Sequence, residues 1–444
     1  MSNKELPISG HLSEDSIVAL WRGRRITSRV FWGHIKSLVR QLPEKQFAIN
    51  VCEDRYLFLV SFFAALIKGQ TNLLPASKVQ SLIEEMAADY NGSYILSDSE
   101  TIRCDYLLTP ADFGSEVNLA PEELNIKADH IAAVVFTSGS TGKSKPNIKS
   151  WGSLHAEALL AIERFSINSD SISAIVATVP PQHMYGLETS IIVPMLSGLA
   201  IVCAPTFYPA DIESAINSVP GLSILITTPI HLKACVNSGV AWNNIKFVIS
   251  ATAMMPTELA KKVEQKLQTK LYEIYGASEY GSVATRRTVK ESVWSLYDGM
   301  RLKLKYGLAY LEGPQFKNEI PVHDIIEIKD TMHFKLVGRD NDLIKIAGKR
   351  VSLADLNQKL WSIEGVVDGI FFAPQDGGRL NARLTAFIVA PGLNKDQVLN
   401  KLKQYIEPAF LPRPLIVVEE LPRNASGKLP HKELQSLFDS LSVS

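Results

Sequence analysis

The chain has 444 residues, more than the about 100–200 residues of one ordinary domain. Hydrophobic residues make up 46% and charged residues 21%, which are values of a globular protein and exclude a wholly disordered chain. Lys and Arg together number 46, as do Asp and Glu, so the formal net charge is zero. Because nucleic-acid-binding proteins normally carry a clear basic excess, we expect no nucleic-acid partner.

The cysteines and the apolar runs indicate a cytoplasmic protein without a membrane span. The four cysteines are scattered along the chain, at Cys52, Cys104, Cys203 and Cys235. None belongs to a C-x-x-C pair, and scattered thiols are typical of a reducing compartment. The first ten residues lack the apolar core of a signal peptide. The longest apolar runs, Tyr56–Ile67 and Ile191–Pro205, are shorter than the about 20 residues that a membrane helix needs.

Short β-branched runs alternate with helix-like stretches over about the first 335 residues. In chain order, the predicted strands are Phe47–Cys52, Tyr94–Leu96, Ile131–Phe136, Ala174–Val179, Ala200–Ala204 and Phe247–Ala251. An apolar helix is predicted over Tyr56–Lys68. Continuous Val and Ile runs are typical of strands that are buried on both faces, and their alternation with helices predicts parallel βαβ sheets.

Two smaller units are predicted after these sheets. Between Val283 and Lys335, short alternating strands with turn residues predict a small antiparallel β subdomain. After Gly338, two helices and three strands predict a small α+β domain, with the strands at Val367–Phe372, Ala386–Val389 and Leu415–Val418. The charged stretch Arg339–Asp342 marks the boundary, so we expect an α/β protein with an N-terminal domain over 1–338 and a C-terminal domain over 339–444.

One predicted strand leads directly into a loop that is suited to phosphate. Ile131–Phe136 continues into TSGSTGKSK, residues Thr137–Lys145. Glycines let backbone N–H groups approach an anion, while hydroxyls and lysines add donors and positive charge. An ATPase or kinase P-loop is a rival interpretation, but that motif needs a glycine where Thr137 stands. Taken alone, the loop is also compatible with a surface turn.

Four motifs in order resemble those of the adenylate-forming superfamily of acyl- and aryl-CoA ligases, luciferases and peptide-synthetase adenylation domains. They are the loop Thr137–Lys145, YGASE at Tyr275–Glu279, the hinge and glycine-containing loop Gly338–Val351, and LPRNASGK at Leu421–Lys428. The resemblance implies the adenylate-forming fold, with a mobile C-terminal domain, and an AMP-forming acid–thiol ligase. The chain also resembles the compact ligases of bacterial aryl-polyene-type pathways, which prime a carrier protein with an aromatic acid.

The resemblance implies a set of ATP-binding residues. Lys145 and the loop hydroxyls would hold the phosphates, Glu279 would help to hold Mg²⁺, and Tyr275 would stack on adenine. Asp324 and Arg339 would bind the ribose. The full predicted set is Thr137, Ser138, Gly139, Ser140, Thr141, Gly142, Lys145, Ala251, Tyr275, Gly276, Ser278, Asp324 and Arg339.

The resemblance also implies catalytic residues, a substrate pocket and a route for the thiol. Lys428 would bridge the carboxylate and the α-phosphate, Glu279 would act through the metal, and His183 would border the carboxylate. The predicted pocket residues are Met184, Tyr185, Thr252, Ala253, Met254, Tyr280 and Gly281. Rotation about Asn341 would bring the loop of Gly348 to the thiol tunnel in the second half-reaction.

Some positions depart from the superfamily pattern. Lys145 is kept, but Ala251 replaces a common glycine, and Asn341 stands where a charged hinge residue is more usual. The sequence Val322-His323-Asp324 lacks the usual hydroxyl before the aspartate. Met184 occupies the position where amino-acid-activating relatives usually have an aspartate, which disfavours α-amino acids.

The sequence therefore predicts an enzyme that uses ATP and Mg²⁺ to activate an aromatic or medium acyl carboxylic acid. The acid would pass to the thiol of CoA or to the phosphopantetheine of an acyl carrier protein. Two alternatives stay open. Glu188, which lies close to Met184, could pair with an amino-acid ammonium. A catalytically silent relative that acts as a binding protein is the other.

Overall fold

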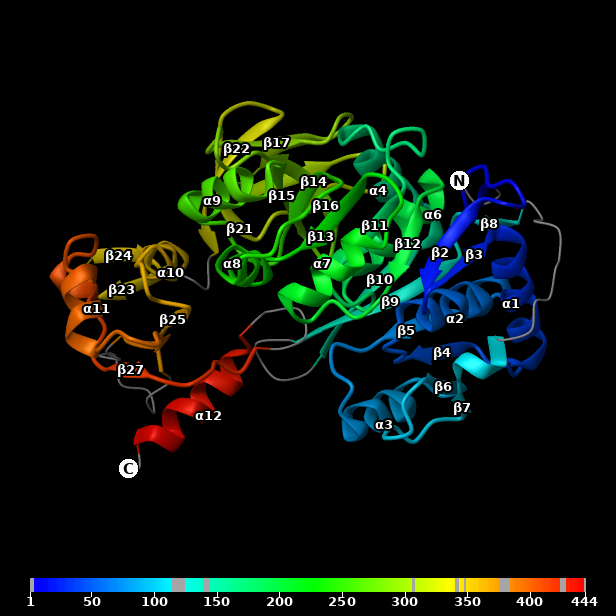
Figure 1. Cartoon of the computed structure of the whole chain (residues 1–444), viewed down its shortest axis with the longest axis horizontal. Helices are drawn as coiled ribbons and strands as arrows, with labels where there is room; N and C mark the ends of the chain where they lie inside the picture. The colour runs from blue at the N-terminus through cyan, green and yellow to red at the C-terminus, as the bar shows by residue number, and fades with distance from the viewer. Residues whose placement is uncertain are drawn as a thin grey trace.

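The computed structural model describes residues 4–113, 124–138, 144–305, 308–339, 343–346, 349–374, 384–423 and 429–442. Within these residues, the chain forms two large sheets, one of six strands and one of 11. Helices lie between and outside the sheets, and a smaller C-terminal group of strands and helices lies at one end of the long axis, orange to red in Figure 1.

The six-stranded sheet carries the predicted phosphate-loop strand. In spatial order it consists of β10 (Ser144–Ser150), β9 (Ile131–Ser138), β5 (Thr71–Leu74), β4 (Phe47–Asn50), β6 (Ser93–Ser97) and β7 (Tyr106–Leu107). All neighbours are parallel except β9 and β10, which pair antiparallel. A separate two-stranded antiparallel sheet joins β1 (Glu5–Pro7) to β8 (Asn125–Lys127).

The larger sheet has a parallel centre and antiparallel edges. Its order is β21 (Asp324–Ile328), β22 (His333–Arg339), β17 (Trp294–Leu296), β16 (Gly281–Arg286), β15 (Lys270–Ala277), β14 (Ile245–Ser250), β13 (Ser223–Thr227), β11 (Ala174–Ala177), β12 (Ala200–Cys203), β2 (Ile17–Trp21) and β3 (Arg24–Thr27). The strands from β15 to β2 run parallel. The predicted α/β class with parallel sheets is confirmed.

Period-two alternation explains why the central strands read as unbroken apolar runs. In β11, Ala174 and Val176 belong to the core on one face of the sheet, whereas Ile175 and Ala177 belong to the core on the other. Successive side chains of a strand point to opposite faces, so a strand covered on both faces needs apolar residues at every position.

Helices cover both sheets and form the middle layer between them. The middle layer contains α1 (Ser28–Gln41), α2 (Arg55–Ile67), α4 (Trp151–Arg164), α5 (Met184–Leu187), the π-helical turn η2 (Glu188–Ile192) and α6 (Val193–Ser197). The outer face of the larger sheet packs on α7 (Pro209–Asn217), α8 (Pro229–Ser238) and α9 (Thr257–Leu267). The outer face of the smaller sheet packs on α3 (Gln80–Asp89). Residues Pro110–Phe113 form a short 3-10 turn.

Eleven consecutive residues of α2, from Tyr56 to Leu66, are buried, as expected for a helix that is apolar all round.

The stretch between Val283 and Lys335 divides between two sheets. The predicted small antiparallel sheet is confirmed and consists of β18 (Arg301–Lys305), β19 (Leu308–Glu312) and β20 (Ile320–Pro321). The other strands of this stretch extend the larger sheet, because β16 folds back antiparallel on β15 and offers its free edge to β17.

The C-terminal part has its own core, and its described residues form three α-helices where the sequence predicted two. Its strands are β23 (Leu343–Ile346), β24 (Lys349–Ser352), β25 (Asp368–Phe372), β26 (Thr385–Val389) and β27 (Leu415–Val417). The helices are α10 (Leu353–Trp361), α11 (Lys395–Leu402) and α12 (His431–Ser442), with a 3-10 turn over Pro408–Phe410. The last of these helices, α12, supplies Leu434, which is buried against Phe372 and Phe387 of the sheet.

Candidate active site

Three segments with predicted site residues follow the carboxyl ends of parallel strands of the larger sheet. After β11 the chain moves to β12 on one side, and it then returns to β13 and β14 on the other side of β11. Ligands of open α/β sheets bind in the crevice at such a topological switch point. The segments that follow β11, β14 and β15 contain His183, Ala251 and Glu279, respectively.

The ends of the predicted phosphate loop are described, and its centre is not. Thr137 and Lys145 are register partners of the β9–β10 pair, and Thr137 Oγ1 donates to the carbonyl of Lys145 at 3.5 Å. Ser138 ends β9 opposite Ser144. The other predicted loop residues lie outside the described residues: Gly139, Ser140, Thr141 and Gly142.

The structure brings Lys145 and Glu279 together, although they are 134 positions apart. The Lys145 ammonium donates to Glu279 Oε1 at 3.0 Å, and both side chains are accessible, at 61% and 36% of their surface. Burial alone would raise the pKa of Glu279, but the hydrogen bond and charge of Lys145 outweigh it and hold the pKa below its ordinary value. Glu279 is therefore an ionised carboxylate beside the phosphate-loop lysine.

The hairpin of β15 and β16 holds Glu279 in its turn. The strands separate at Ala277 and rejoin at Gly281, so Ser278 and Glu279 lie in the turn between them. Gly281 adopts φ +71°, which a side chain rarely tolerates. A Cβ on Gly276 would lie 2.8 Å from Cα of Ser282, so only glycine permits this approach of the strands.

Tyr275 and Asp324 are joined by a hydrogen bond. The Tyr275 hydroxyl donates to Asp324 Oδ2 at 2.7 Å, and the Tyr280 hydroxyl donates to the Tyr275 oxygen at 3.2 Å. The ring of Tyr275 is 7% exposed and meets Phe334 edge-on at 5.2 Å. Arg339 is the register partner of Asp324 across β21 and β22. The predicted adenine and ribose residues therefore lie together, and their roles stay predictions.

One segment of the predicted pocket is tied to the ends of two parallel strands. His183 is half-buried at the start of α5, and Met184 is buried. The Tyr185 hydroxyl donates to the carbonyls of Thr227 at 3.1 Å and Ile249 at 3.0 Å, which ties α5 to the ends of β13 and β14. Burial raises the pKa of Tyr185, so this hydroxyl stays neutral.

The loop after β14 carries an unusual backbone conformation. Thr252 has φ +76°, in the left-handed region that β-branched residues seldom adopt. Such strain costs about 1–3 kcal/mol and is concentrated at functional sites. Ala251 and Met254 of this loop are half-buried, and Ala253 is exposed.

The predicted catalytic lysine and hinge residues, Lys428, Asn341 and Gly348, lie outside the described residues. Arg423, which belongs to the same motif as Lys428, is anchored, because its guanidinium donates to both carboxylate oxygens of Asp368 at 2.7 and 2.6 Å. The ring of Trp361 receives Arg423 at 5.5 Å and Lys233 of α8 at 5.2 Å. Trp361 therefore connects α8 to the motif of Lys428.

Sequence reasoning missed a buried polar cluster beneath the turn of Glu279. Its members are Lys149 of β10, Glu157 of α4, Glu188 of η2, Ser282 of β16 and Tyr297. All five are at most 5% exposed. The spacing of Lys145 and Lys149 places both lysines on one face of a strand, but it does not predict that Lys149 is buried.

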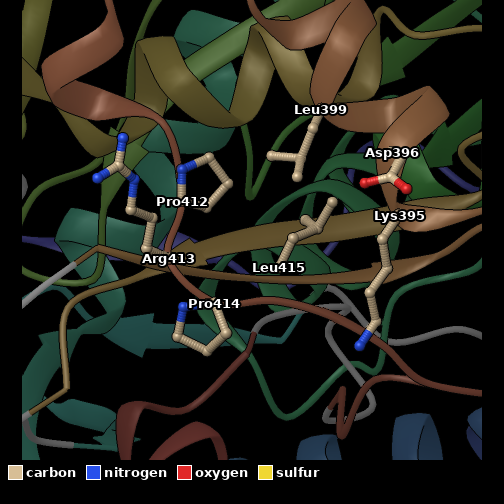
Figure 2. A pocket seen from close by; sticks show the side chains of 7 residues that line it. All are labelled: Lys395, Asp396, Leu399, Pro412, Arg413, Pro414 and Leu415. Atoms are coloured by element: carbon tan, nitrogen blue, oxygen red, sulfur yellow. The ribbon is translucent and has the colours of Figure 1, made fainter.

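No described group of three or more His, Cys, Asp or Glu side chains is arranged to hold a metal ion. No helix of the described residues is long and apolar enough to cross a membrane. A hollow of about 500 Å³ lies on the C-terminal part, where Lys395 and Arg413 flank Leu415 (Figure 2). None of the predicted site residues lines it.

Comparison with known proteins decides the family. Residues 41–304, more than half of the chain, match the family model described as AMP-binding enzyme. The chain belongs to the AMP-binding enzyme family. The predicted membership of the adenylate-forming superfamily is therefore confirmed, and with it, at the level of the family, the prediction of an AMP-forming acid–thiol ligase.

Relatives of this AMP-binding enzyme include two bacterial proteins named 4-coumarate–CoA ligase. The one from Halorhodospira halophila is 27% identical over 68% of this chain and 76% of its own length. The one from Rhodobacter capsulatus is 27% identical over 60% of this chain and 65% of its own length. The solved structure of O-succinylbenzoate coenzyme A synthetase from Bacillus subtilis, in complex with ATP and magnesium ion, has a TM-score of 0.78 at 17% identity, covering 97% of this chain and 100% of that one.

Proposed function

We propose that this AMP-binding enzyme activates an aromatic or medium acyl carboxylic acid as its adenylate and then transfers it to a phosphopantetheine thiol. The contact between Lys145 and Glu279, beside the hydrogen-bonded pair of Tyr275 and Asp324, is the observation that carries the proposal. At one edge of the larger sheet, this arrangement brings together the Lys145 ammonium for phosphates, the Glu279 carboxylate for a metal and the predicted nucleoside residues.

The first half-reaction is a displacement at phosphorus. A substrate carboxylate oxygen attacks the α-phosphorus of ATP, the bond to the β-phosphate oxygen breaks, and pyrophosphate leaves. Lys145 exchanges its contact with Glu279 for the leaving phosphates and stabilises their charge. Lys428 places a second positive charge between the carboxylate and the α-phosphate, and His183 borders the carboxylate.

The residues present fit a magnesium ion. Mg²⁺ prefers carboxylate, water and phosphate oxygens and is usually held by one or two carboxylates together with substrate phosphates. Glu279 supplies an ionised and accessible carboxylate beside the phosphate loop. When bound, the ion neutralises charge on the departing phosphates. The magnesium and ATP in the Bacillus subtilis synthetase agree with this assignment.

The pocket segment favours an acid without an α-amino group. Both oxygens of Glu188 already accept hydrogen bonds from Ser282, one from its N–H at 3.0 Å and one from its hydroxyl. Glu188 is 1% exposed, so its carboxyl group is engaged within the protein and is not accessible to the ammonium group of a substrate. The buried side chain of Met184 and the engaged hydroxyl of Tyr185 leave an apolar lining. The names of the two coumarate ligases support an aromatic acid.

The second half-reaction replaces AMP by a thiol. The thiolate attacks the acyl carbon, the bond to the phosphate oxygen breaks, and AMP leaves. We propose CoA or an acyl carrier protein as acceptor, since both present the same phosphopantetheine arm.

We also propose a cytoplasmic location. The four cysteines are unpaired thiols, which supports it.

Carboxylate-dependent ATP–pyrophosphate exchange tests the proposal. Benzoates, cinnamates, fatty acids and amino acids are compared with purified protein, and Lys428→Ala serves as the control that should be silent. We expect exchange with a benzoate, a cinnamate or a medium-chain acid. Exchange with amino acids alone would establish the alternative, and silence with every acid, while ATP still binds, would indicate a catalytically inactive relative.

A further inference from the structure

Two lysines on the same face of β10 contact the two ends of Glu279. The Lys145 ammonium binds the carboxylate at 3.0 Å, and the Lys149 ammonium donates to the backbone carbonyl of the same residue at 3.4 Å. Lys145 is 61% exposed, whereas the side chain of Lys149 is 3% exposed. Lys145 is therefore free to move to a ligand, and Lys149 is held in the interior.

Glu157 fixes Lys149 from the middle layer of helices. The Lys149 ammonium donates to Glu157 Oε1 at 2.9 Å, and the side chain of Glu157 is 1% exposed. Gly281 packs on this carboxylate so closely that an added Cβ would lie 2.5 Å from Glu157 Cδ. The pair of Lys149 and Glu157 thus touches the hairpin turn at both Glu279 and Gly281.

A second buried carboxylate, that of Glu188, is hydrogen-bonded to β16, the strand that leaves the turn. Glu188 accepts hydrogen bonds from both the N–H and the hydroxyl of Ser282, and the charge of Glu157 acts on Glu188. Burial and the charge of Glu188 raise the pKa of the Tyr297 hydroxyl, which lies beside this group. Polar side chains from three elements therefore surround residues 279–282.

Stability does not explain this arrangement. Burying a Lys–Glu pair removes two charges from water, and buried pairs can often be replaced by apolar residues with no loss or with a gain of about 1–4 kcal/mol. An apolar pair at these positions would fill the same space between β10 and α4. The feature that it would lose is the hydrogen bond to the Glu279 carbonyl.

We propose that Lys149, oriented by Glu157, is a positioning residue that fixes the backbone of Glu279 and keeps its carboxylate in place for Mg²⁺ after Lys145 has moved to the phosphates of ATP. The inference rests on the proposed role of Glu279 as a magnesium ligand. Groups that orient a metal ligand typically contribute about 10- to 100-fold to metal affinity.

The test is direct binding of ATP at a series of Mg²⁺ concentrations, followed by titration calorimetry. In the double variant Lys149→Met, Glu157→Leu, both charges are removed together, so we expect it to fold. The Mg²⁺ concentration that gives half-maximal ATP binding should rise about tenfold. Glu157→Gln should give a smaller rise, because the amide oxygen still accepts from the Lys149 ammonium.

A matched control removes a different ion pair of the same fold. Arg287 and Glu264 join through two hydrogen bonds at 2.8 and 2.6 Å, with side chains 20% and 14% exposed. Arg287→Met combined with Glu264→Leu should leave the Mg²⁺ dependence of ATP binding at its wild-type value. A similar rise in this control would show a general effect of lost ion pairs and would overturn the assignment.

Two results separate failure of the inference from failure of the function. A folded double variant with the wild-type Mg²⁺ dependence overturns the role of Lys149. If that variant does not fold, Lys149→Met combined with Glu157→Gln decides, because it also removes the hydrogen bond to the Glu279 carbonyl, and a wild-type Mg²⁺ dependence there overturns the role equally. Wild-type protein that binds ATP without any dependence on Mg²⁺ would contradict the proposed role of Glu279 itself.

Discussion

Glu188 should make the stability of this protein depend on pH in an unusual direction. Burial raises the pKa of this carboxyl to about 7 from its ordinary value of 4.5, and the charge of Glu157 adds to the rise. Hydrogen bonds from Ser282 and the charge of Lys149 oppose it. Tyr185 and Tyr297 are the other titratable groups that Glu188 affects, and burial raises the pKa of both, so they stay neutral.

The sign follows from proton binding. Between pH 4.5 and about 7 the folded protein keeps a proton on Glu188 that the unfolded chain has released, so the free energy of unfolding falls as pH rises through this interval. At about 1.4 kcal/mol for each pH unit, the interval corresponds to about 3 kcal/mol. Above about pH 7, Glu188 is ionised in both the folded and the unfolded chain, so its contribution to the free energy of unfolding no longer changes with pH.

Glu188→Gln removes the titration and keeps the shape. The amide oxygen can still accept from the N–H of Ser282, and the amide group can donate to its hydroxyl. At pH 5 the variant should be close to wild type in stability, and by pH 8 it should be more stable by about 2–3 kcal/mol.

Urea unfolding of both proteins at pH 5, 6, 7 and 8, followed by tryptophan fluorescence, measures the difference. Other titrating groups contribute equally to the two proteins, so the difference reports on the network of Glu188. A stability difference that stays constant from pH 5 to pH 8 would refute the reasoning, because it would show that Glu188 titrates alike in the folded and unfolded chains.

Three further substitutions test other parts of the account. Gly281→Ala should lower the free energy of unfolding by about 2–4 kcal/mol in thermal unfolding, because the new methyl group collides with Glu157 and the backbone has φ +71°. The control Gly239→Ala, at φ +76° with open space around it, should cost about 1 kcal/mol. Equal losses in the two variants would contradict the predicted clash. Burial lowers the pKa of Lys233 to about 8, so Lys233→Met should raise the unfolding temperature at pH 7, and this gain should shrink toward pH 10. A variant that is destabilised at pH 7 would show that the contact of Lys233 with the ring of Trp361 dominates. Lys428→Ala should abolish adenylate formation and spare thiol transfer from a supplied acyl-adenylate, and equal loss of both half-reactions would remove Lys428 from its proposed role.

The sequence predicted those features that depend on local pattern. The run at Ile131–Phe136 became β9, because a strand covered on both faces must be apolar throughout. The resemblance assigned Lys145 to the phosphates and Glu279 to the metal of one site, and the two side chains lie 3.0 Å apart. The tyrosine and aspartate assigned to the nucleoside, Tyr275 and Asp324, also lie in contact.

Features that depend on distant contacts were not predictable. Lys149 stands in a polar strand segment where a lysine is ordinarily solvated, and only the approach of α4 and the 279–282 turn buries it. The carboxylates that face this turn, Glu157 and Glu188, come from two helices, and no spacing in the sequence links them. Similarly, β16 joins the larger sheet because it pairs with β15, a choice that the alternating pattern alone leaves open.

The identity of the nucleotide products tests the central claim most directly. With ATP, Mg²⁺, the best acid from the exchange panel and either CoA or a phosphopantetheinylated carrier protein, mass spectrometry can follow thioester and nucleotide together. We expect one AMP for each thioester formed, with pyrophosphate released before the thiol is added. Formation of ADP and phosphate, or a thioester without AMP, would contradict it.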